Sequence, residues 1–218
     1  MGELDGTTAA VWDDASGLGA AIATTLEAAG ANLARDDGEE VAPFLAAAAE
    51  RLGGLDLAVI CLGEAGPSQP LAEVSDENWQ REIDDQLGVA FRGVRAALAQ
   101  MLPRGRGRIL VTTTVESKLA RAGATPYVAA QHGVAGLVKS VAHEVGPQGV
   151  LVNALVCGAI AGNDGDGDAA ALARTERGAI KRPNTAAEVA AAALALASPA
   201  MSSVTGTLFP VHGGTVPY

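Results

Sequence analysis

Tyr127 and Gln131 stand four positions apart in a segment that predicts a helix, so they share one face of it. A tyrosine hydroxyl can give a proton to a reacting oxygen, but its ordinary pKa of about 10 is too high for efficient exchange near neutrality. Gln131 offers hydrogen bonds but carries no charge with which to lower that pKa. Thr114 supplies a second hydroxyl, which can donate to an oxyanion. These residue types indicate proton transfer at an oxygen atom of a small molecule.

A glycine turn at Gly17–Gly19 joins a predicted first strand to a predicted first helix. Glycines at such a turn let the backbone come close to a pyrophosphate at the positive end of the helix. The turn's place in the chain supports that interpretation, as does Gly30 at the expected end of the helix. The alternative is that these glycines only allow the helix to pack tightly on the strand.

Short apolar runs alternate with alanine-rich helical stretches along the chain. Strands separated by helices imply right-handed crossovers and a parallel sheet covered on both faces. We find no internal repeat and no linker, and therefore expect one domain over residues 1–218. The expected strands are 9–12, 32–34, 57–62, 108–113, 151–156 and 207–211, and the expected helices are 17–29, 41–52, 76–102, 126–145 and 185–197.

Composition restricts the function. The formal net charge of −10 argues against nucleic acid and against anionic membranes as partners. No apolar run is long enough to span a membrane, and the acidic start does not resemble a signal peptide. Cys61 and Cys157 fall in apolar segments, where buried reduced thiols are the default. We therefore expect a cytoplasmic protein that acts on a small molecule.

Five segments together resemble the short-chain dehydrogenase/reductase family in order and spacing, from about Ala9 to the C-terminus. They are Asp56–Gly63, Gly107–Val115, Tyr127–Gln131, Val152–Gly158 and Val204–Gly214. The resemblance implies a Rossmann-type, doubly wound parallel sheet in three α/β/α layers and the chemistry of an NAD(P)-dependent ketoreductase. It also implies a homodimer or homotetramer built on the helices at 76–102 and 126–145.

The catalytic residues that the resemblance implies depart from the family pattern. The family's tyrosine is the general acid, and the lysine four residues later lowers its pKa and holds the nicotinamide ribose; here these are Tyr127 and Gln131. A positive charge about 4–5 Å from the tyrosine, at an effective dielectric constant of roughly 20, stabilises the tyrosinate by about 3–4 kcal/mol, or two to three pKa units. Because glutamine is uncharged, most of this lowering of the pKa is lost. The family's serine is Thr114 and its structural asparagine is Gln86. We assign the catalytic site to Tyr127, Thr114, Gln131 and Gln86.

The cofactor site that the resemblance implies departs further. The first glycine of the family's loop is Asp13, and Asp14 follows it. A carboxylate about 4 Å from a pyrophosphate costs on the order of 4 kcal/mol, or nearly a thousandfold in affinity. The segment between Arg35 and Leu55 is about half the family's length, and we expect it to lack one helix and one strand that wall the adenine pocket. By resemblance the cofactor contacts are Asp13, Ser16, Gly17, Leu18, Gly19, Gly63, Cys157 and Gly158.

The acidic residues after the second strand bear on which dinucleotide would bind. Asp36, Asp37, Glu39 and Glu40 put negative charge where the adenosine ribose would lie, which disfavours a 2′-phosphate. Arg35 is the one feature that favours binding of a 2′-phosphate. We therefore expect either no cofactor or weakly bound NAD(H), with NADP(H) disfavoured.

A loop at 162–168 has an Asp-x-Asp-x-Asp core like that of a calcium site. Ala169 and Thr175 stand where that site needs Gly and Glu, so we interpret the loop as a solvated lid and expect no metal. We expect His132 to be a packing or interface residue, His143 to lie on the surface, and His212 to be structural.

Three functions are compatible with these residues. The first is a divergent NAD(H)-dependent carbonyl reductase or alcohol dehydrogenase with weak cofactor binding. The second is a cofactor-independent enzyme of the isomerase, dehydratase or cyclase type, and the third is a non-catalytic subunit. Erosion of the cofactor contacts favours the second and third, whereas the family's usual chemistry favours the first. We expect normal ketoreductase activity to be lost, with the weak reductase as the alternative.

Overall fold

The computed structural model describes residues 2–14, 17–36, 40–161 and 175–216, and its centre is a six-stranded sheet. The strand order is β2-β1-β3-β4-β5-β6, and every paired neighbour is parallel. The strands are β1 (Thr8–Asp13), β2 (Asn32–Arg35), β3 (Leu57–Cys61), β4 (Gly107–Thr114), β5 (Val150–Cys157) and β6 (Leu208–Val211). This is the doubly wound Rossmann-type sheet that we predicted.

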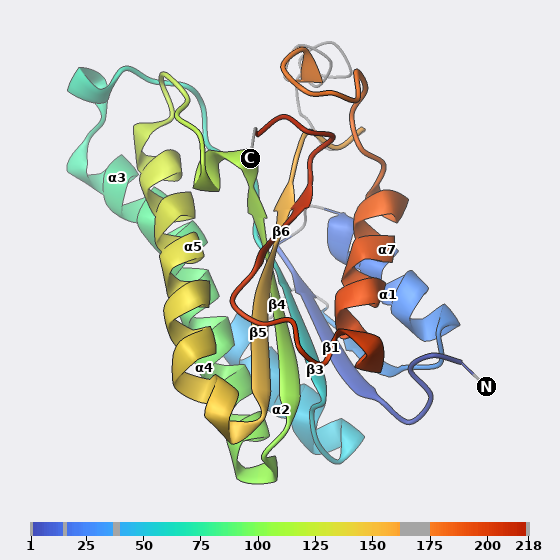
Figure 1. Cartoon of the computed structure of the whole chain (residues 1–218). Helices are drawn as coiled ribbons and strands as arrows, with labels where there is room; N and C mark the ends of the chain where they lie inside the picture. The colour runs from blue at the N-terminus through green and yellow to red at the C-terminus, as the bar shows by residue number, and fades with distance from the viewer. Residues whose placement is uncertain (1, 15–16, 37–39, 162–174, 217–218) are drawn as a thin grey trace.

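Helices cover both faces of the sheet, which gives three layers (Figure 1). The helices are α1 (Leu18–Ala28), α2 (Val41–Leu52), α3 (Asp76–Ile83), α4 (Val89–Met101), α5 (Thr125–Val145) and α7 (Ala186–Ala197). The buried side chains of α2, α4 and α5 pack with one face of the sheet, and those of α1 and α7 pack with the other. The inner strands β1, β3, β4 and β5 are largely buried on both faces, as a parallel sheet requires, and β3 is buried at every position, whereas the edge strands β2 and β6 are partly exposed.

The order in which successive strands are added to the sheet changes direction between β1 and β3. From β1 the chain runs outward to β2, and then crosses to β3 on the other side and continues to β6. In such sheets the crevice outside the carboxyl ends of the strands at this point is the usual ligand site. Asp13 ends β1 and pairs in register with Cys61, which ends β3, so the residues that follow both strands meet at this crevice.

The predicted elements are present, with one correction. The stretch from 76 to 102, predicted as one helix, is α3 and α4 joined by a π-helical turn at Asp84–Gly88, with a 3₁₀ turn after Met101. A π turn adds a residue to the helical repeat, so it changes which side chains face inward. Gln86 lies inside this turn and is 2% exposed, which places an amide in the core near α5.

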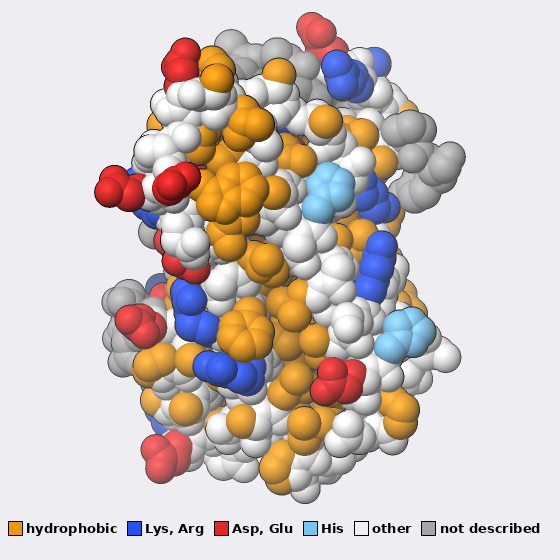
Figure 2. All heavy atoms as spheres, turned by 90° about the vertical axis from the view of Figure 1, so that its left-hand side faces the viewer, with side chains coloured by type: hydrophobic (Ala, Val, Ile, Leu, Met, Phe, Trp, Pro, Cys, Tyr) orange, Lys and Arg blue, Asp and Glu red, His pale blue; other side chains and the backbone are white. Residues whose placement is uncertain are grey.

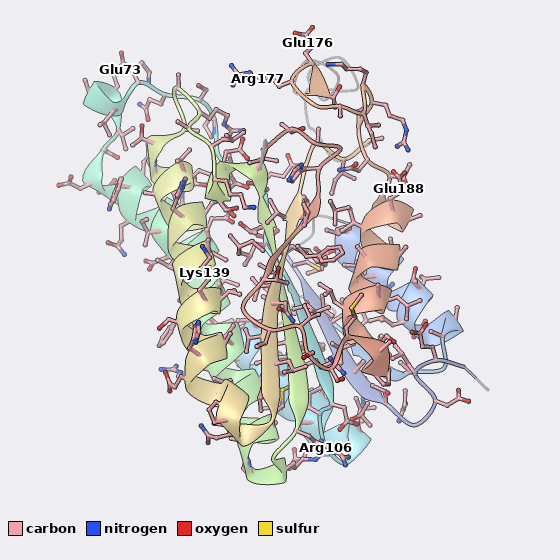
Figure 3. All side chains as sticks on the ribbon, in the orientation of Figure 1. Glu73, Arg106, Lys139, Glu176, Arg177 and Glu188 are labelled. Carbon is pink, nitrogen blue, oxygen red and sulfur yellow. The ribbon has the colours of Figure 1, made fainter. Side chains whose placement is uncertain are left out.

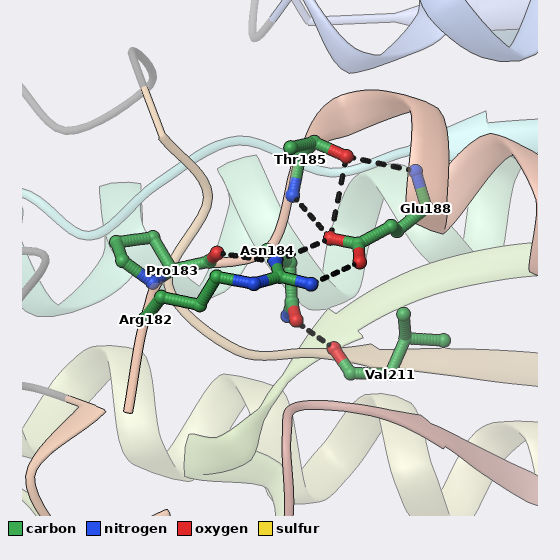
Figure 4. Close-up of polar contacts among 6 residues, drawn as sticks. All are labelled: Arg182, Pro183, Asn184, Thr185, Glu188 and Val211. Carbon is green, nitrogen blue, oxygen red and sulfur yellow. Dashed lines mark hydrogen bonds and ion pairs between the residues drawn. The ribbon is translucent and has the colours of Figure 1, made fainter. Parts of the chain in front are cut away.

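The start of α7 is fixed by a capping box (Figure 4). The Thr185 hydroxyl accepts from the Glu188 backbone N–H at 3.2 Å, and the Glu188 carboxylate accepts from the Thr185 backbone N–H at 2.8 Å. Arg182 adds two hydrogen bonds to the same carboxylate, at 2.6 and 2.9 Å. The Asn184 side chain donates to the Val211 carbonyl at 2.7 Å, which ties this segment to β6.

Charged side chains mark the two ends of the molecule (Figure 3). Arg106 lies at the end where β4 begins and pairs with Asp56 at 3.1 Å. Glu176 and Arg177 lie at the opposite end, beyond the carboxyl ends of the strands. None of the helices within the described residues combines the length and apolarity needed to cross a lipid bilayer.

Candidate functional site

A cavity of about 510 Å³ opens at the carboxyl ends of β3, β4 and β5. This volume suits a small molecule or part of a cofactor. Its lining brings together residues from α1, from α5 and from the ends of several strands, among them Leu18, Gly63, Thr114, Tyr127, Gln131 and Gly158. With Cys157, seven of the residues assigned from the sequence therefore line one cavity.

Tyr127 and Thr114 form a pair of hydroxyls at this cavity. The Tyr127 hydroxyl donates to Thr114 Oγ1 at 3.3 Å, and the tyrosine is 3% exposed. Burial raises the pKa of Tyr127 far above its ordinary value, although the hydrogen bond with Thr114 lowers it. The hydroxyl is therefore protonated throughout the neutral range and is placed to donate.

Gln131 sits beneath this pair and is fully buried. Its Oε1 accepts from the Thr113 hydroxyl at 2.5 Å and from the Thr114 backbone N–H at 3.3 Å. Its Nε2 donates to Gln86 Oε1 at 2.9 Å, and Gln86 Nε2 donates to the Glu64 carbonyl at 3.5 Å. The chain of amides satisfies these buried polar groups without a charge and supports the backbone at Thr114.

Two charged residues at the cavity, Glu116 and Arg121, were missed by the sequence analysis. They lie between β4 and α5, in a segment without helical or strand periodicity. Arg121 Nη1 is 3.2 Å from Glu116 Oε1, and the guanidinium carbon lies 5.4 Å from the centre of the Tyr127 ring. Glu116 raises the pKa of Tyr127, whereas Arg121 lowers it. The cavity thus contains a cation near the tyrosine, but one already paired with a carboxylate.

The glycine turn holds an internal anion. Asp13 Oδ2 accepts from the backbone N–H of Gly17 at 3.0 Å and of Gly19 at 3.2 Å. Gly17 has a left-handed φ of 76°, and a Cβ atom at Gly19 would lie 2.5 Å from that of Asp13, so both positions require glycine. Ser16, assigned to the cofactor site, lies outside the described residues.

Asp14 occupies the other side of the same crevice. A Cβ atom at Gly63 would lie 2.2 Å from Asp14 Oδ2, and the Gly63 backbone N–H is hydrogen-bonded to this carboxylate. Desolvation, followed by repulsion from Asp13, raises the pKa of Asp14 to about 6. Gly63, assigned as a cofactor contact, is therefore in contact with a side chain of the protein itself.

The remaining candidates are inert or distant. Cys61 and Cys157 are buried free thiols, and burial raises the pKa of Cys157 to about 12, so neither is a reactive thiolate near neutrality. His132 and His143 are exposed, so His132 does not pack inside the chain as one of our two interpretations had it. His212 is 4% exposed, in keeping with a structural role. The calcium-like loop lies outside the described residues, and no cluster within them could hold a metal ion.

Comparisons with known proteins agree with this architecture. A family model described as enoyl-(acyl carrier protein) reductase matches residues 35–216. Cis-4-hydroxycyclohexanecarboxylate dehydrogenase of Sinomonas cyclohexanicum is 36% identical over 184 residues, which cover 82% of this chain and 72% of the relative. The 3-oxoacyl-(acyl-carrier-protein) reductase FabG of Vibrio harveyi is 34% identical over 208 residues, which cover 91% of this chain and 82% of the relative. A solved structure described as a dehalogenation enzyme, 21% identical, superposes with a TM-score of 0.89 over 98% of this chain and 99% of the other.

Proposed function

Because the chain belongs to the short-chain dehydrogenase/reductase family, we propose that it is an NAD(H)-dependent carbonyl reductase or alcohol dehydrogenase with a weakly bound cofactor. The observation that carries the proposal is the Tyr127–Thr114 hydroxyl pair at the wall of the 510 Å³ cavity. The printed names of the two relatives, a dehydrogenase and a reductase, support the same class of reaction. The substrate is a small compound with a carbonyl or hydroxyl group.

The residues of the chain supply the proton and hold the reacting oxygen. Tyr127 Oη donates its proton to the substrate oxygen, and the Thr114 hydroxyl donates a hydrogen bond to the same atom. Gln131 and Gln86 keep the Thr114 backbone in place through the buried amide chain. NADH, when bound, supplies the hydride. Because burial raises the pKa of Tyr127, the hydroxyl carries the proton that reduction needs at neutral pH, but it is a weaker acid than a free tyrosine, which makes the reaction slow.

The crevice has the donors that a dinucleotide needs. The backbone N–H groups of Gly17 and Gly19 hold the carboxylate of Asp13, which supports the proposal that the turn can hold a ligand's anion. The same carboxylate weakens a phosphate's hold on these donors. Asp36, which follows β2 and bonds through its N–H to the Val11 carbonyl at 3.0 Å, adds negative charge beside the position of the adenosine ribose. These contacts support NADH over NADPH.

We also propose that the protein is a cytoplasmic homodimer or homotetramer. The two free, buried thiols suit a reducing compartment.

Figure 2 shows the face that carries α3, α4 and α5, on which hydrophobic side chains gather. Trp79 of α3 is 39% exposed and Phe91 of α4 is 46% exposed. A Cβ atom at Gly136 of α5 would contact nothing, which leaves room for a second copy to approach closely.

A second function, cofactor-independent acid–base catalysis in the same cavity, is favoured by one specific observation. The donors of the glycine turn are occupied by Asp13, and the position of the usual lysine is Gln131, a neutral side chain whose oxygen and nitrogen are both hydrogen-bonded in the core. In that case Tyr127 and Thr114 act on a small carbonyl or hydroxy compound without hydride transfer. The two functions differ in one measurable property, which is saturable binding of NADH.

The test is a titration of the protein with NADH, followed by nicotinamide fluorescence, and then a steady-state assay with small ketones. We expect saturable binding and slow NADH-dependent reduction. Tyr127→Phe should lower kcat at least about a hundredfold without changing the Kd for NADH, because the proton donor is lost while the cofactor contacts remain. Absence of saturable NADH binding would overturn this proposal and support the cofactor-independent enzyme.

A further inference from the structure

The turn between β1 and α1 is bonded to the side chain of the residue that precedes it. Asp13 turns its carboxylate back onto the backbone N–H groups of Gly17 and Gly19. The free N–H groups at the start of a helix carry partial positive charge and attract an anion. The negative charge that a ligand would bring to such a site is therefore supplied by the Asp13 carboxylate.

A second carboxylate closes the crevice from the side of β3. Asp14 contacts Gly63, which lines the cavity directly after Leu62. Asp13 and, more weakly, Asp85 repel the charge of Asp14, and the opposing contribution at Asp14 is the backbone N–H of Gly63. Asp13 and Asp14 thus connect the turn after β1 to the turn after β3, across the point where a dinucleotide's pyrophosphate would cross the sheet edge.

From these contacts we infer that Asp13 and Asp14 form an internal occupant of the pyrophosphate site, which a dinucleotide must displace in order to bind. This inference rests on the proposed function, since it concerns how the proposed cofactor enters. It identifies the ligand by its chemistry as a pyrophosphate diester, and it makes Asp13 the residue that sets the affinity. Displacement requires that the Asp13 and Asp14 side chains rotate away, and it leaves the donors in place because they belong to the backbone.

The competing explanation is that Asp13 is only a cap for α1. A cap contributes to stability and has no effect on nucleotide affinity. Asp13→Asn separates the two explanations, because the amide oxygen can still accept from Gly17 and Gly19 while the charge is removed. Asp5→Asn is the matched control. It removes the same charge from a carboxylate that bonds to the Gly2 N–H, in a different part of the fold.

The experiment measures the affinity of the wild type, Asp13→Asn and Asp5→Asn for ADP-ribose by calorimetry, and for NADH by fluorescence. ADP-ribose contains the pyrophosphate and lacks the nicotinamide, so it reports on this site without redox chemistry. We expect Asp13→Asn to bind ADP-ribose at least about tenfold more tightly than the wild type, and Asp5→Asn to bind like the wild type. Asp13→Ser provides a second neutral variant if the asparagine variant does not fold.

The outcomes for the two proposals are distinguishable. Tighter ADP-ribose binding by the neutral variants supports the internal occupant, even if none of the proteins binds NADH, which would overturn only the proposed function. Equal ADP-ribose affinity in the wild type and both neutral variants overturns the internal occupant, even if NADH binds and is oxidised. As a measurement on the unaltered protein, ADP-ribose should bind more tightly at pH 5 than at pH 8, because Asp14 becomes neutral below about pH 6. No change between these pH values would count against the inference.

Discussion

The side-chain amide of Gln131 donates a hydrogen bond to the side-chain carbonyl of Gln86 at 2.9 Å, and both side chains are buried. The two residues come from α5 and from the π turn between α3 and α4. Each amide offers a donor and an acceptor, and the geometry uses both at Gln131. The site is therefore built around a neutral side chain, and a charge at position 131 would have no partner among the residues that contact it.

Introducing the family's usual lysine by Gln131→Lys should therefore lower the stability of the folded protein. A buried ammonium without a counter-ion should lower the free energy of unfolding by roughly 3 kcal/mol at pH 7. Since burial depresses the pKa of a lysine, this loss should shrink as the pH rises toward the ordinary lysine value of about 10.4. Urea unfolding at several pH values measures it. Gln148→Lys, at an exposed position, is the control and should change little; an unaltered stability in Gln131→Lys would show that the core accommodates the charge.

Neutralising Glu116 should make Tyr127 more acidic. Glu116 and Glu64 raise the pKa of Tyr127, and Arg121 lowers it. Glu116→Gln removes one of the repulsive charges and also frees the Arg121 guanidinium from its ion pair. The titration midpoint of Tyr127 should fall in this variant and rise in Arg121→Gln.

The chain has two tyrosines, so the tyrosinate absorbance of Tyr127 can be followed alone in a Tyr218→Phe background. Glu73→Gln is a suitable control, because Glu73 lies on the periphery of the molecule (Figure 3). If Glu116→Gln and Glu73→Gln titrate alike, the electrostatic influence of Glu116 on the tyrosine is refuted.

Strands and helices were predictable because their signals are local. The apolar runs and the glycines at helix ends place α2 at Val41–Leu52 and the other elements within a few residues. The pairing of Thr114 with Tyr127 followed from the resemblance. The π turn at Gln86 and the Glu116–Arg121 pair were not predictable, because they depend on how separate segments meet in space. The same holds for Asp13: the sequence indicated an unfavourable charge, whereas the structure shows that charge satisfied by the donors of the glycine turn.

The capping box of α7 predicts how stability depends on pH. The hydrogen bond with Arg182, followed by that with the Thr185 backbone, lowers the pKa of Glu188 to about 2. A depressed carboxylate pKa contributes stability above the unfolded value, which is lost as the pH falls from about 4.5 toward about 2. Glu188→Gln should remove this part of the acid dependence of Tm, and Thr185→Ala should cost about 1 kcal/mol at neutral pH. Superimposable Tm profiles for Glu188→Gln and the wild type between pH 2 and 4.5 would contradict the assignment.

The exposed face of α4 predicts self-association. Phe91 is 46% exposed, and the Arg95 guanidinium lies 4.8 Å from the centre of its ring, so an apolar surface and a cation are presented together. Phe91→Glu replaces an aromatic contact by a carboxylate that must be desolvated at the interface even though Arg95 lies beside it, and the complex should dissociate to monomers. Size-exclusion chromatography with light scattering measures this directly. Ile180→Glu is the matched control, because Ile180 is equally exposed at 50% but follows β5 and precedes α7 on the other side of the sheet. If both variants keep the wild-type mass, the face of α4 is not the interface.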